Sequence, residues 1–275
     1  MKEDKKPKKK KKAGDVLLTV VLIAAICIFC YAAYNLYHIY TEYKKGSDEY
    51  NAIAQMAVTE RDPDQDAQEQ EPAGPEGPTL KAPMDIDFDS LRSINTDVIG
   101  WIYVEALDGV SYPVVRGTDN DQYLHMTYEK NYNFAGTIFI DYENKADFSD
   151  CNTLVYGHNM KSGMMFGELK KYLDEDFYNA HKTIEFNTLY ERGVYEVIEV
   201  GLSEVQYQDE NVFRYYNFLN ADSEEEYQEY LNNVAQLSVY GEEIDSAYGD
   251  QLLTLSTCNN YTQDGRMFIL AKRVQ

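Results

Sequence analysis

The feature of this chain that most constrains its fold is a series of short apolar runs rich in β-branched and aromatic residues. Gly, Asp and Asn residues separate the runs, as expected where strands end in turns. The 25 tyrosines of the chain also suit a strand-rich core. Eight runs are found: Gly100–Val104, Ser111–Val115, Gly136–Ile140, Thr153–His158, Thr183–Phe186, Tyr190–Val200, Gln251–Cys258 and Arg266–Val274. They predict a mainly β domain, either a closed barrel or a sandwich.

Two helices are expected to interrupt these strands. One covers roughly Met165–Leu173. The other begins at Ser223 and has Glu226 three residues later, which is the pattern of a capping box. Its apolar side chains would share one face, which carries Tyr227, Tyr230, Leu231 and Val234. A short helix before the first strand is also expected, capped by Asp87 or Asp89.

A membrane segment is predicted near the N-terminus. Val16–Ala33 is apolar except for Thr19 and Tyr31, and as a helix it would span about 27 Å, close to the thickness of a bilayer core. The alternative is a cleaved signal peptide, but the apolar run is long for one and no clear Ala-Xaa-Ala site follows it. An uncleaved anchor is therefore favoured. Lysines at Lys5–Lys12 place the N-terminus in the cytoplasm and the rest of the chain outside.

Charge is divided unevenly along the 275 residues. The first fifteen hold eight lysines and three acidic residues, a net charge of +5, whereas the remaining 17 basic and 44 acidic residues sum to −27. A domain this acidic repels nucleic acid, so no nucleic-acid partner is expected.

Composition divides the chain into four expected parts. The spacer is recognised by proline, since five of the seven prolines lie from residue 59 to 83 among acidic residues, Gln and Gly. The parts are a basic cytoplasmic tail at 1–15, a transmembrane anchor at 16–40, a juxtamembrane helix with an acidic, proline-rich spacer at 41–83, and a catalytic domain at 84–275.

A cysteine at the tip of a strand indicates the chemistry. Cys258 ends the run Thr254 to Cys258, and alternation along a strand would point it away from the leucines, into a groove. One alternative is a disulfide with Cys151, the other cysteine outside the apolar segment, and another is a small core residue. Arg266 opens the next strand as a cation that favours a thiolate and can bind an oxyanion. His158, at the end of another run, can move the proton. His125 and His181 are expected to be structural or solvated.

No cofactor or metal is expected from the sequence. Outside the membrane run there is no Cys-Xaa-Xaa-Cys pair, and no two histidines have helical spacing. A phosphate-binding glycine loop is also missing.

Several motifs, taken together and in order, resemble the class B sortases over the whole segment from Met84 to the C-terminus. They are Gly100-Trp101-Ile102, Tyr112-Pro113-Val114-Val115, Asn120 to Leu124, Gly136-Thr137-Ile138-Phe139, Tyr156-Gly157-His158-Asn159-Met160, Thr254 to Cys258, and Arg266. The resemblance implies an eight-stranded sortase barrel with an N-terminal helix and a helix inserted before the cysteine-bearing strand.

The resemblance also implies an activity. Such enzymes are membrane-bound cysteine transpeptidases on the outer face of Gram-positive bacteria. They cleave a sorting signal, often Asn-Pro-Xaa-Thr-Gly/Asn-like in class B, through a thioester, and an amine of a peptidoglycan precursor of the lipid II type then resolves it. Carried onto this chain, Cys258 is the nucleophile, His158 the general acid and then base, and Arg266 the oxyanion and substrate holder. Five residues would line the signal groove: Asn120, Leu124, Tyr156, Ser256 and Thr257.

Two other functions compete with anchoring of surface proteins to the cell wall. A class B sortase can instead polymerise pilins, with a pilin lysine as the resolving amine. A third interpretation, a non-catalytic membrane-tethered binding domain, is disfavoured by the intact set of Cys258, His158 and Arg266.

Overall fold

The computed structural model describes residues 13–60, 84–107, 109–204, 212–241, 243–258 and 265–275. Contacts divide the chain into two compact units, Met1–Lys45 and Gly46–Gln275. The basic tail at 1–12 and most of the expected spacer, at 61–83, lie outside the described residues.

The first unit consists of the greater part of helix α1 (Ala13–Ala57). Its apolar side chains from Val16 to Ile39 are largely exposed, and one stretch of α1 is long and apolar enough to cross a membrane. Beyond residue 40, the expected end of the anchor, the helix continues without a break to Ala57, over part of the stretch where a juxtamembrane helix is expected.

The last turns of α1 belong to the second unit. Tyr50, Ile53 and Ala57 are buried there, at the i, i+3, i+7 spacing of one helix face. The backbone N–H of Asp87 also donates to the carbonyl of Ala57, at 2.8 Å. The compact unit thus begins at Gly46, upstream of the expected domain boundary at Met84.

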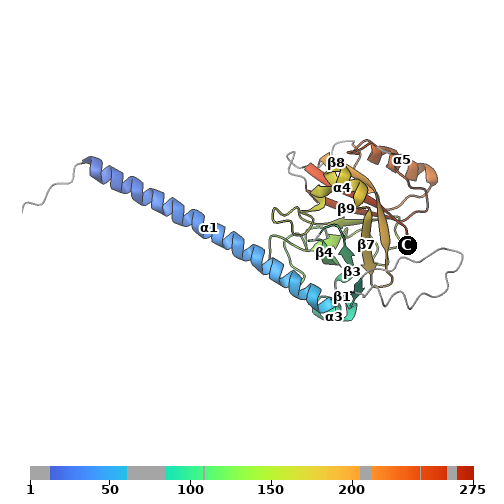
Figure 1. Ribbon diagram of the computed structural model, residues 1–275, viewed down its shortest axis with the longest axis horizontal. Helices are drawn as coiled ribbons and strands as arrows, with labels where there is room; N and C mark the ends of the chain where they lie inside the picture. Colours follow the sequence, from blue (N-terminus) through green and yellow to red (C-terminus); the bar gives the residue numbers. More distant parts are fainter. Residues whose placement is uncertain (1–12, 61–83, 108, 205–211, 242, 259–264) are drawn as a thin grey trace, which may run out of the picture. The chain divides into compact units, whose positions relative to one another are not determined.

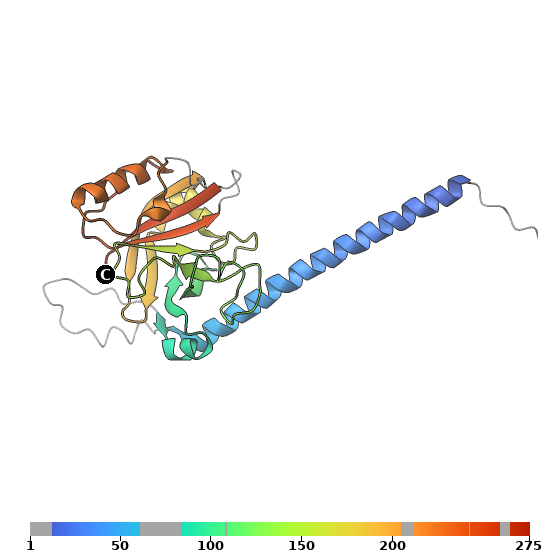
Figure 2. The same ribbon diagram turned by 180° about the vertical axis from the view of Figure 1, so that it is seen from behind.

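The second unit is built around a closed barrel of eight strands, as Figures 1 and 2 show from opposite sides. The order around the barrel is β10-β8-β7-β3-β4-β5-β6-β9, and the pairing of β9 with β10 closes it. Neighbouring strands are antiparallel except for β4–β5 and β6–β9, which are parallel. The strands are β3 (Val98–Tyr103), β4 (Ser111–Arg116), β5 (Ile138–Ile140), β6 (Asn152–Tyr156), β7 (Thr183–Thr188), β8 (Val194–Glu204), β9 (Leu252–Cys258) and β10 (Gly265–Arg273). The prediction of a mainly β fold is confirmed, as a barrel and not a sandwich.

A short sheet and a helix precede the barrel. Strands β1 (Val58–Glu60) and β2 (Met84–Ile86) pair with each other, and α3 (Phe88–Ile94) follows them. Of the two candidate caps, Asp87 is the one used, because its carboxylate accepts from the backbone N–H of Ser90 at 3.0 Å. Leu91 is fully buried, and α3 contacts β3.

The predicted helix before the cysteine-bearing strand is confirmed as α5 (Glu224–Ala235). The hydroxyl of Ser223 accepts from the backbone N–H of Glu226, and all four predicted apolar side chains are buried. They pack against the 3-10 turn η2 (Tyr215–Asn217) and against β9 and β10, through Leu252, Phe268 and Leu270. The outer faces of β9 and β10 are therefore covered (Figure 1).

The helix predicted over Met165–Leu173 is wrong. Met165 has a positive φ of 54° and bridges back to Asn159, so this segment is a turn. Only the 3-10 helix η1 (Leu169–Leu173) follows it, and then α4 (Glu175–Ala180), which was not predicted. Phe166 and Leu169 are nevertheless fully buried.

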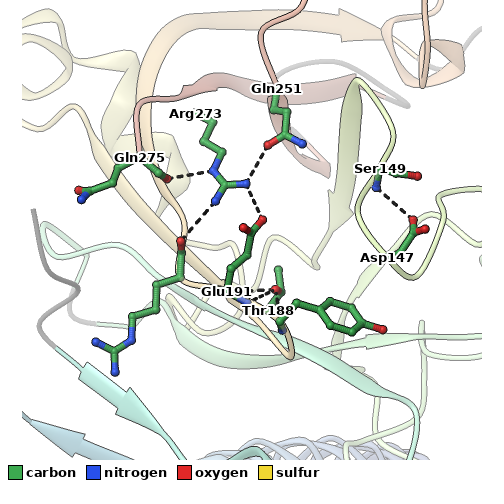
Figure 3. A network of polar contacts seen from close by, with 9 residues as sticks. Asp147, Ser149, Thr188, Glu191, Gln251, Arg273 and Gln275 are labelled. Carbon is green, nitrogen blue, oxygen red and sulfur yellow. Dashed lines mark hydrogen bonds and ion pairs between the residues drawn. The ribbon is translucent and has the colours of Figure 1, made fainter. Parts of the chain in front are cut away.

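Arg273 is the last residue of β10, at the opposite end of that strand from Arg266, and it connects several segments there (Figure 3). Its Nη1 donates to Glu191 at 2.5 Å and to Gln251 at 2.8 Å, and its Nε donates to the carbonyl of Gln275 at 2.9 Å. One side chain therefore joins the β7–β8 turn, the entry to β9 and the C-terminus.

Candidate active site

The parallel pair β6–β9 brings two distant motifs to the same edge of the barrel. Tyr156 lies opposite Ser256, so His158 and Cys258 each follow two residues further on. Contacts continue beyond the strands, because Asn159 Nδ2 donates to the carbonyl of Cys258 at 2.7 Å. The sheet register therefore sets the placement of the histidine beside the cysteine.

The antiparallel pair β9–β10 adds the arginine. Arg266 is the direct partner of Cys258 across this pair, and its Nη1 donates to the sulfur at 3.2 Å. Both residues are half-buried, at the tips of their strands. A guanidinium in this position stabilises negative charge on the sulfur or on an atom bonded to it.

All eight residues that the sequence analysis selected line one cavity of about 340 Å³. Five other residues complete the lining, and sequence reasoning missed them. The full lining is Asn120, Asp121, Leu124, Phe139, Tyr156, Gly157, His158, Tyr215, Tyr216, Ser256, Thr257, Cys258 and Arg266.

Alternation along β9 places Cys258 on the opposite face from Leu253 and Leu255, as the sequence predicts. Thr254 and Ser256 share the face of Cys258, and both are buried because η2 and α5 cover that side. The hydroxyl of Ser256 lies 2.8 Å from that of Tyr215, and the hydroxyl of Thr257 donates to the carbonyl of Gly157 at 2.7 Å. These two side chains hold the walls of the cavity together.

His158 is oriented by a backbone carbonyl. Its Nε2 lies 2.8 Å from the oxygen of Leu124, which can only accept, so Nε2 carries the hydrogen. The nitrogen left to gain or lose a proton is Nδ1. Burial lowers the pKa of His158, the Leu124 carbonyl opposes this, and positive charge on His125 and Arg266 lowers it further. The ring is therefore mostly neutral at neutral pH.

His125 stacks on His158, a relationship that the sequence did not indicate. The two ring centroids are 5.6 Å apart and the ring planes differ by 16°. His125 is exposed, as expected, and also contacts the ring of Tyr132. No local pattern could have found this pair, because the two histidines lie on separate loops.

A buried carboxylate fixes the other wall. Asp141 Oδ2 accepts from the hydroxyl of Tyr156 and from Asn120 Nδ2, both at 2.9 Å. The amide oxygen of Asn120 accepts in turn from the backbone N–H of Tyr142, at 3.0 Å. The amide plane of Asn120 is thus set before any ligand arrives. Asp141 follows directly on β5, and that position at a strand end was the available signal.

Tyr215 and Tyr216 enter the cavity from η2. Burial raises the pKa of Tyr215, so its hydroxyl stays protonated and acts as a neutral hydrogen-bond partner. The ring of Tyr215 stacks on Phe268 of β10, with centroids 4.3 Å apart.

Cys151 is not paired with Cys258, since both thiols are free. Burial raises the pKa of Cys151 to about 11, and the negative charges of Asp250 and Asp150 add to the rise. Cys151 therefore remains a protonated thiol. Among the residues described, no three His, Cys, Asp or Glu side chains are grouped as metal ligands.

Comparison with known proteins places this geometry in a family. The model of the sortase domain matches residues 102–274. Sortase B of Listeria monocytogenes is 38% identical over 189 residues, which cover 67% of this chain and 72% of the relative. A crystal structure of sortase B from Bacillus anthracis superposes with a TM-score of 0.67 at 28% identity, covering 86% of this chain and 99% of that one. A Staphylococcus aureus sortase B–substrate complex gives 0.59 at 30% identity, covering 68% and 84%.

The chain therefore belongs to the sortase family, and within it to class B. It is a cysteine transpeptidase of the sortase type, and the interpretation as a non-catalytic binding domain is set aside.

Proposed function

We propose that this sortase cleaves a C-terminal sorting signal of surface proteins, of the Asn-Pro-Xaa-Thr-Gly/Asn type, and joins the threonine to an amine of a peptidoglycan precursor. The observation that carries the proposal is the single cavity in which a half-buried cysteine, a half-buried histidine and an arginine meet. A relative, Staphylococcus aureus sortase B, is known as a complex with its substrate.

In the first step, the sulfur of Cys258 attacks the threonine carbonyl of the signal. The carbonyl oxygen gains negative charge, and the Arg266 guanidinium, already 3.2 Å from the sulfur, lies close enough to stabilise it. As the sulfur attacks, Nδ1 of His158 takes the thiol proton of Cys258 and then gives it to the leaving amine, while its Nε2–H stays on the Leu124 carbonyl. The products are a thioester and a free peptide amine.

In the second step, His158 takes a proton from the incoming amine, which attacks the thioester carbon. Collapse of the intermediate restores the Cys258 thiolate and leaves an amide bond. The signal peptide itself would lie along Asn120, Leu124, Tyr156, Ser256 and Thr257, the predicted groove residues that share the cavity.

We also assign the apolar part of α1, residues 16–40, as the membrane anchor. Its exposed apolar surface suits a bilayer core, and the basic tail that precedes it favours a cytoplasmic N-terminus with the barrel outside the cell. The protein would then be single-pass, and its acceptor would be a lipid-linked precursor at the same membrane surface.

The test is mass spectrometry of the full-length protein in detergent, mixed with signal peptides. We expect a mass increase on Cys258 that matches the peptide up to threonine, and none in Cys258→Ala or His158→Ala. Addition of a peptidoglycan-type amine should release the peptide from Cys258 as an amide. If a pilin lysine releases the peptide far more efficiently than this amine, pilin polymerisation is supported instead. An adduct that builds up in His158→Ala would contradict the general-acid role.

A further inference from the structure

The loop that faces His158 runs from Tyr123 to Thr137 and is called the 123–137 loop below. It supplies the Leu124 carbonyl to Nε2 of His158 and stacks the ring of His125 on it. The loop is held partly by its own contacts, which include the hydrogen bond from the backbone N–H of Asn133 to the carbonyl of His125 at 3.0 Å and the bridge between Met126 and Tyr132. Contacts with neighbouring segments add to these in fixing the Leu124 carbonyl.

One side of the 123–137 loop is held by the segment around α3. The hydroxyl of Tyr128 donates to the carbonyl of Leu91 at 2.5 Å. The hydroxyl of Tyr123 donates to Asp97 at 2.6 Å. Both bonds join residues downstream of Met84, within the catalytic domain that the sequence predicts.

The other side is held by the last turns of α1. The hydroxyl of Tyr50 donates to the carbonyl of Gly136 at 2.6 Å and lies 3.0 Å from the hydroxyl of Thr137. Tyr50 is 4% exposed, and its ring meets that of Tyr112 edge to face at 5.3 Å, so the hydroxyl has little freedom. Glu49, the preceding residue, accepts from a backbone N–H of the same loop, at Glu129.

Gly136, whose carbonyl accepts from Tyr50, is in contact with the Leu124 carbonyl that accepts from His158. Gly136 has a φ of 61°, and a Cβ there would lie 2.4 Å from the oxygen of Leu124 and 2.5 Å from that of Tyr123. The next residue, Thr137, donates its N–H to the same Tyr123 carbonyl, at 3.1 Å. A shift of Gly136 therefore moves Leu124.

From this chain of contacts we propose that Tyr50 is a positioning residue for His158, acting through Gly136 and the Leu124 carbonyl. The turns Gly46–Ala57, which lie on the same helix downstream of the proposed membrane anchor, then support the active site. The inference rests on the proposed role of His158. Among the described residues, His125 and Arg266 are the charged groups that lower the pKa of His158. The other titratable groups that line its cavity are Asp121, Tyr156, Tyr215, Tyr216 and Cys258. Tyr50→Phe replaces none of these residues, so it acts on His158 through the position of the loop.

The experiment compares two tyrosine-to-phenylalanine variants of the full-length protein in detergent. Tyr50→Phe removes the bond to Gly136 and keeps the buried ring. Tyr240→Phe is the matched control, because its hydroxyl also donates to a backbone carbonyl, that of Tyr172, at 2.7 Å, and Tyr240 does not line the cavity. The readouts are kcat and KM for a signal peptide, thermal stability, and the NMR titration of His158 in protein with labelled histidines.

We expect Tyr50→Phe to lower kcat about fivefold, the effect of one net hydrogen bond, with KM changed less than twofold. The His158 resonances should also shift and titrate at a different pH, whereas Tyr240→Phe should change thermal stability only. The proposal is overturned if Tyr50→Phe matches Tyr240→Phe in both kcat and the His158 titration. If no signal peptide is cleaved by the wild-type protein, the proposed substrate is wrong, and the His158 titration still decides the role of Tyr50.

Discussion

Arg266 and Cys258 are direct cross-strand partners, and the Nη1 of the arginine lies 3.2 Å from the sulfur. The same nitrogen lies 3.3 Å from the carbonyl of Gly265, which limits the orientation of the guanidinium. The positive charge is therefore in place before a substrate arrives, as electrostatic preorganisation requires.

Arg266→Lys should be far less active than the wild type, although the charge is kept. A planar guanidinium can bond the sulfur or oxyanion and a peptide carbonyl together, whereas an ammonium acts as a point charge. We expect kcat/KM for a signal peptide to fall by about a hundredfold, the usual effect of losing one oxyanion donor. A lysine variant with near-normal kcat/KM would mean that Arg266 contributes charge alone.

The pH profile of kcat/KM should be bell-shaped, and His125 should displace it. Cys258 and His158 share a proton in the proposed mechanism, so the two limbs belong to the pair. Burial is the main cause of the lowered pKa of His158, and positive charge on His125 lowers it further. Removing that charge should therefore raise the pKa of His158 and move the limb it governs to higher pH.

Two variants separate the charge of His125 from its stacking. His125→Phe keeps a flat ring against His158, whereas His125→Ala keeps neither ring nor charge. Both should shift the pH profile, and only the alanine variant should also lower kcat at its optimum. Unchanged profiles in both variants would show that the stack has no influence on His158.

Glu185 makes the protein less stable as pH rises. Its side chain is buried on β7, and its Oε2 has no hydrogen-bond partner among the described residues. Burial, with the negative charge of Glu105, raises the pKa of Glu185 to about 7. A carboxyl with a raised pKa binds its proton more tightly in the folded state, so its stabilising effect is complete below about pH 4.5 and is lost as pH rises through 7.

Glu185→Gln should remove this loss. We expect the variant to be more stable than the wild type at pH 8 by on the order of 2 kcal/mol, and similar to it at pH 5. Denaturant unfolding of both proteins at the two pH values measures the difference. Equal stability at pH 8 would indicate that Glu185 ionises without penalty.

Arg273 should matter for stability and not for catalysis. It bonds three segments at the end of the barrel away from the cavity (Figure 3). Arg273→Gln should lower the free energy of unfolding by about 1–2 kcal/mol, a few degrees in Tm, with kcat/KM at 25 °C unchanged. The Arg273 hydrogen bond lowers the pKa of Glu191, so this difference should shrink as pH falls through the lowered pKa of Glu191. If the Arg273→Gln protein is fully folded and has still lost turnover, Arg273 also contributes to catalysis.

The strands of the barrel were predictable because their signal is local. Each run of β-branched and aromatic residues is bounded by turn residues, and all eight predicted runs correspond to strands. The helix at Glu224–Ala235 was predictable for the same reason, since both its cap and its apolar face lie within twelve residues. The segment Met165–Leu173 was not, because its backbone turns at Met165 with a positive φ and only its second half is helical, as the 3-10 helix η1.

Residues that act through tertiary contacts were missed. Tyr215 and His125 carry no local pattern that distinguishes them from other polar or aromatic residues, and Asp141 has only its position at the end of a strand. Tyr50 is different, because Tyr50, Ile53 and Ala57 do form an i, i+3, i+7 series. Because the series directly follows a longer apolar helix, it looks like a continuation of that helix, and its packing against the barrel domain was not predicted.

The parallel register of β6 and β9 has a consequence for how such a protein changes. Tyr156 lies opposite Ser256 although a long segment connects them, so the spacing of His158 and Cys258 is set by the register of the two strands and not by the length of that segment. Insertions in the surface loops of the connection, which leave β7, β8 and the buried face of α5 in place, should therefore keep this spacing. The connection is therefore the natural place to graft a new wall for the cavity, so that peptide preference can be redesigned while the reacting groups are inherited unchanged.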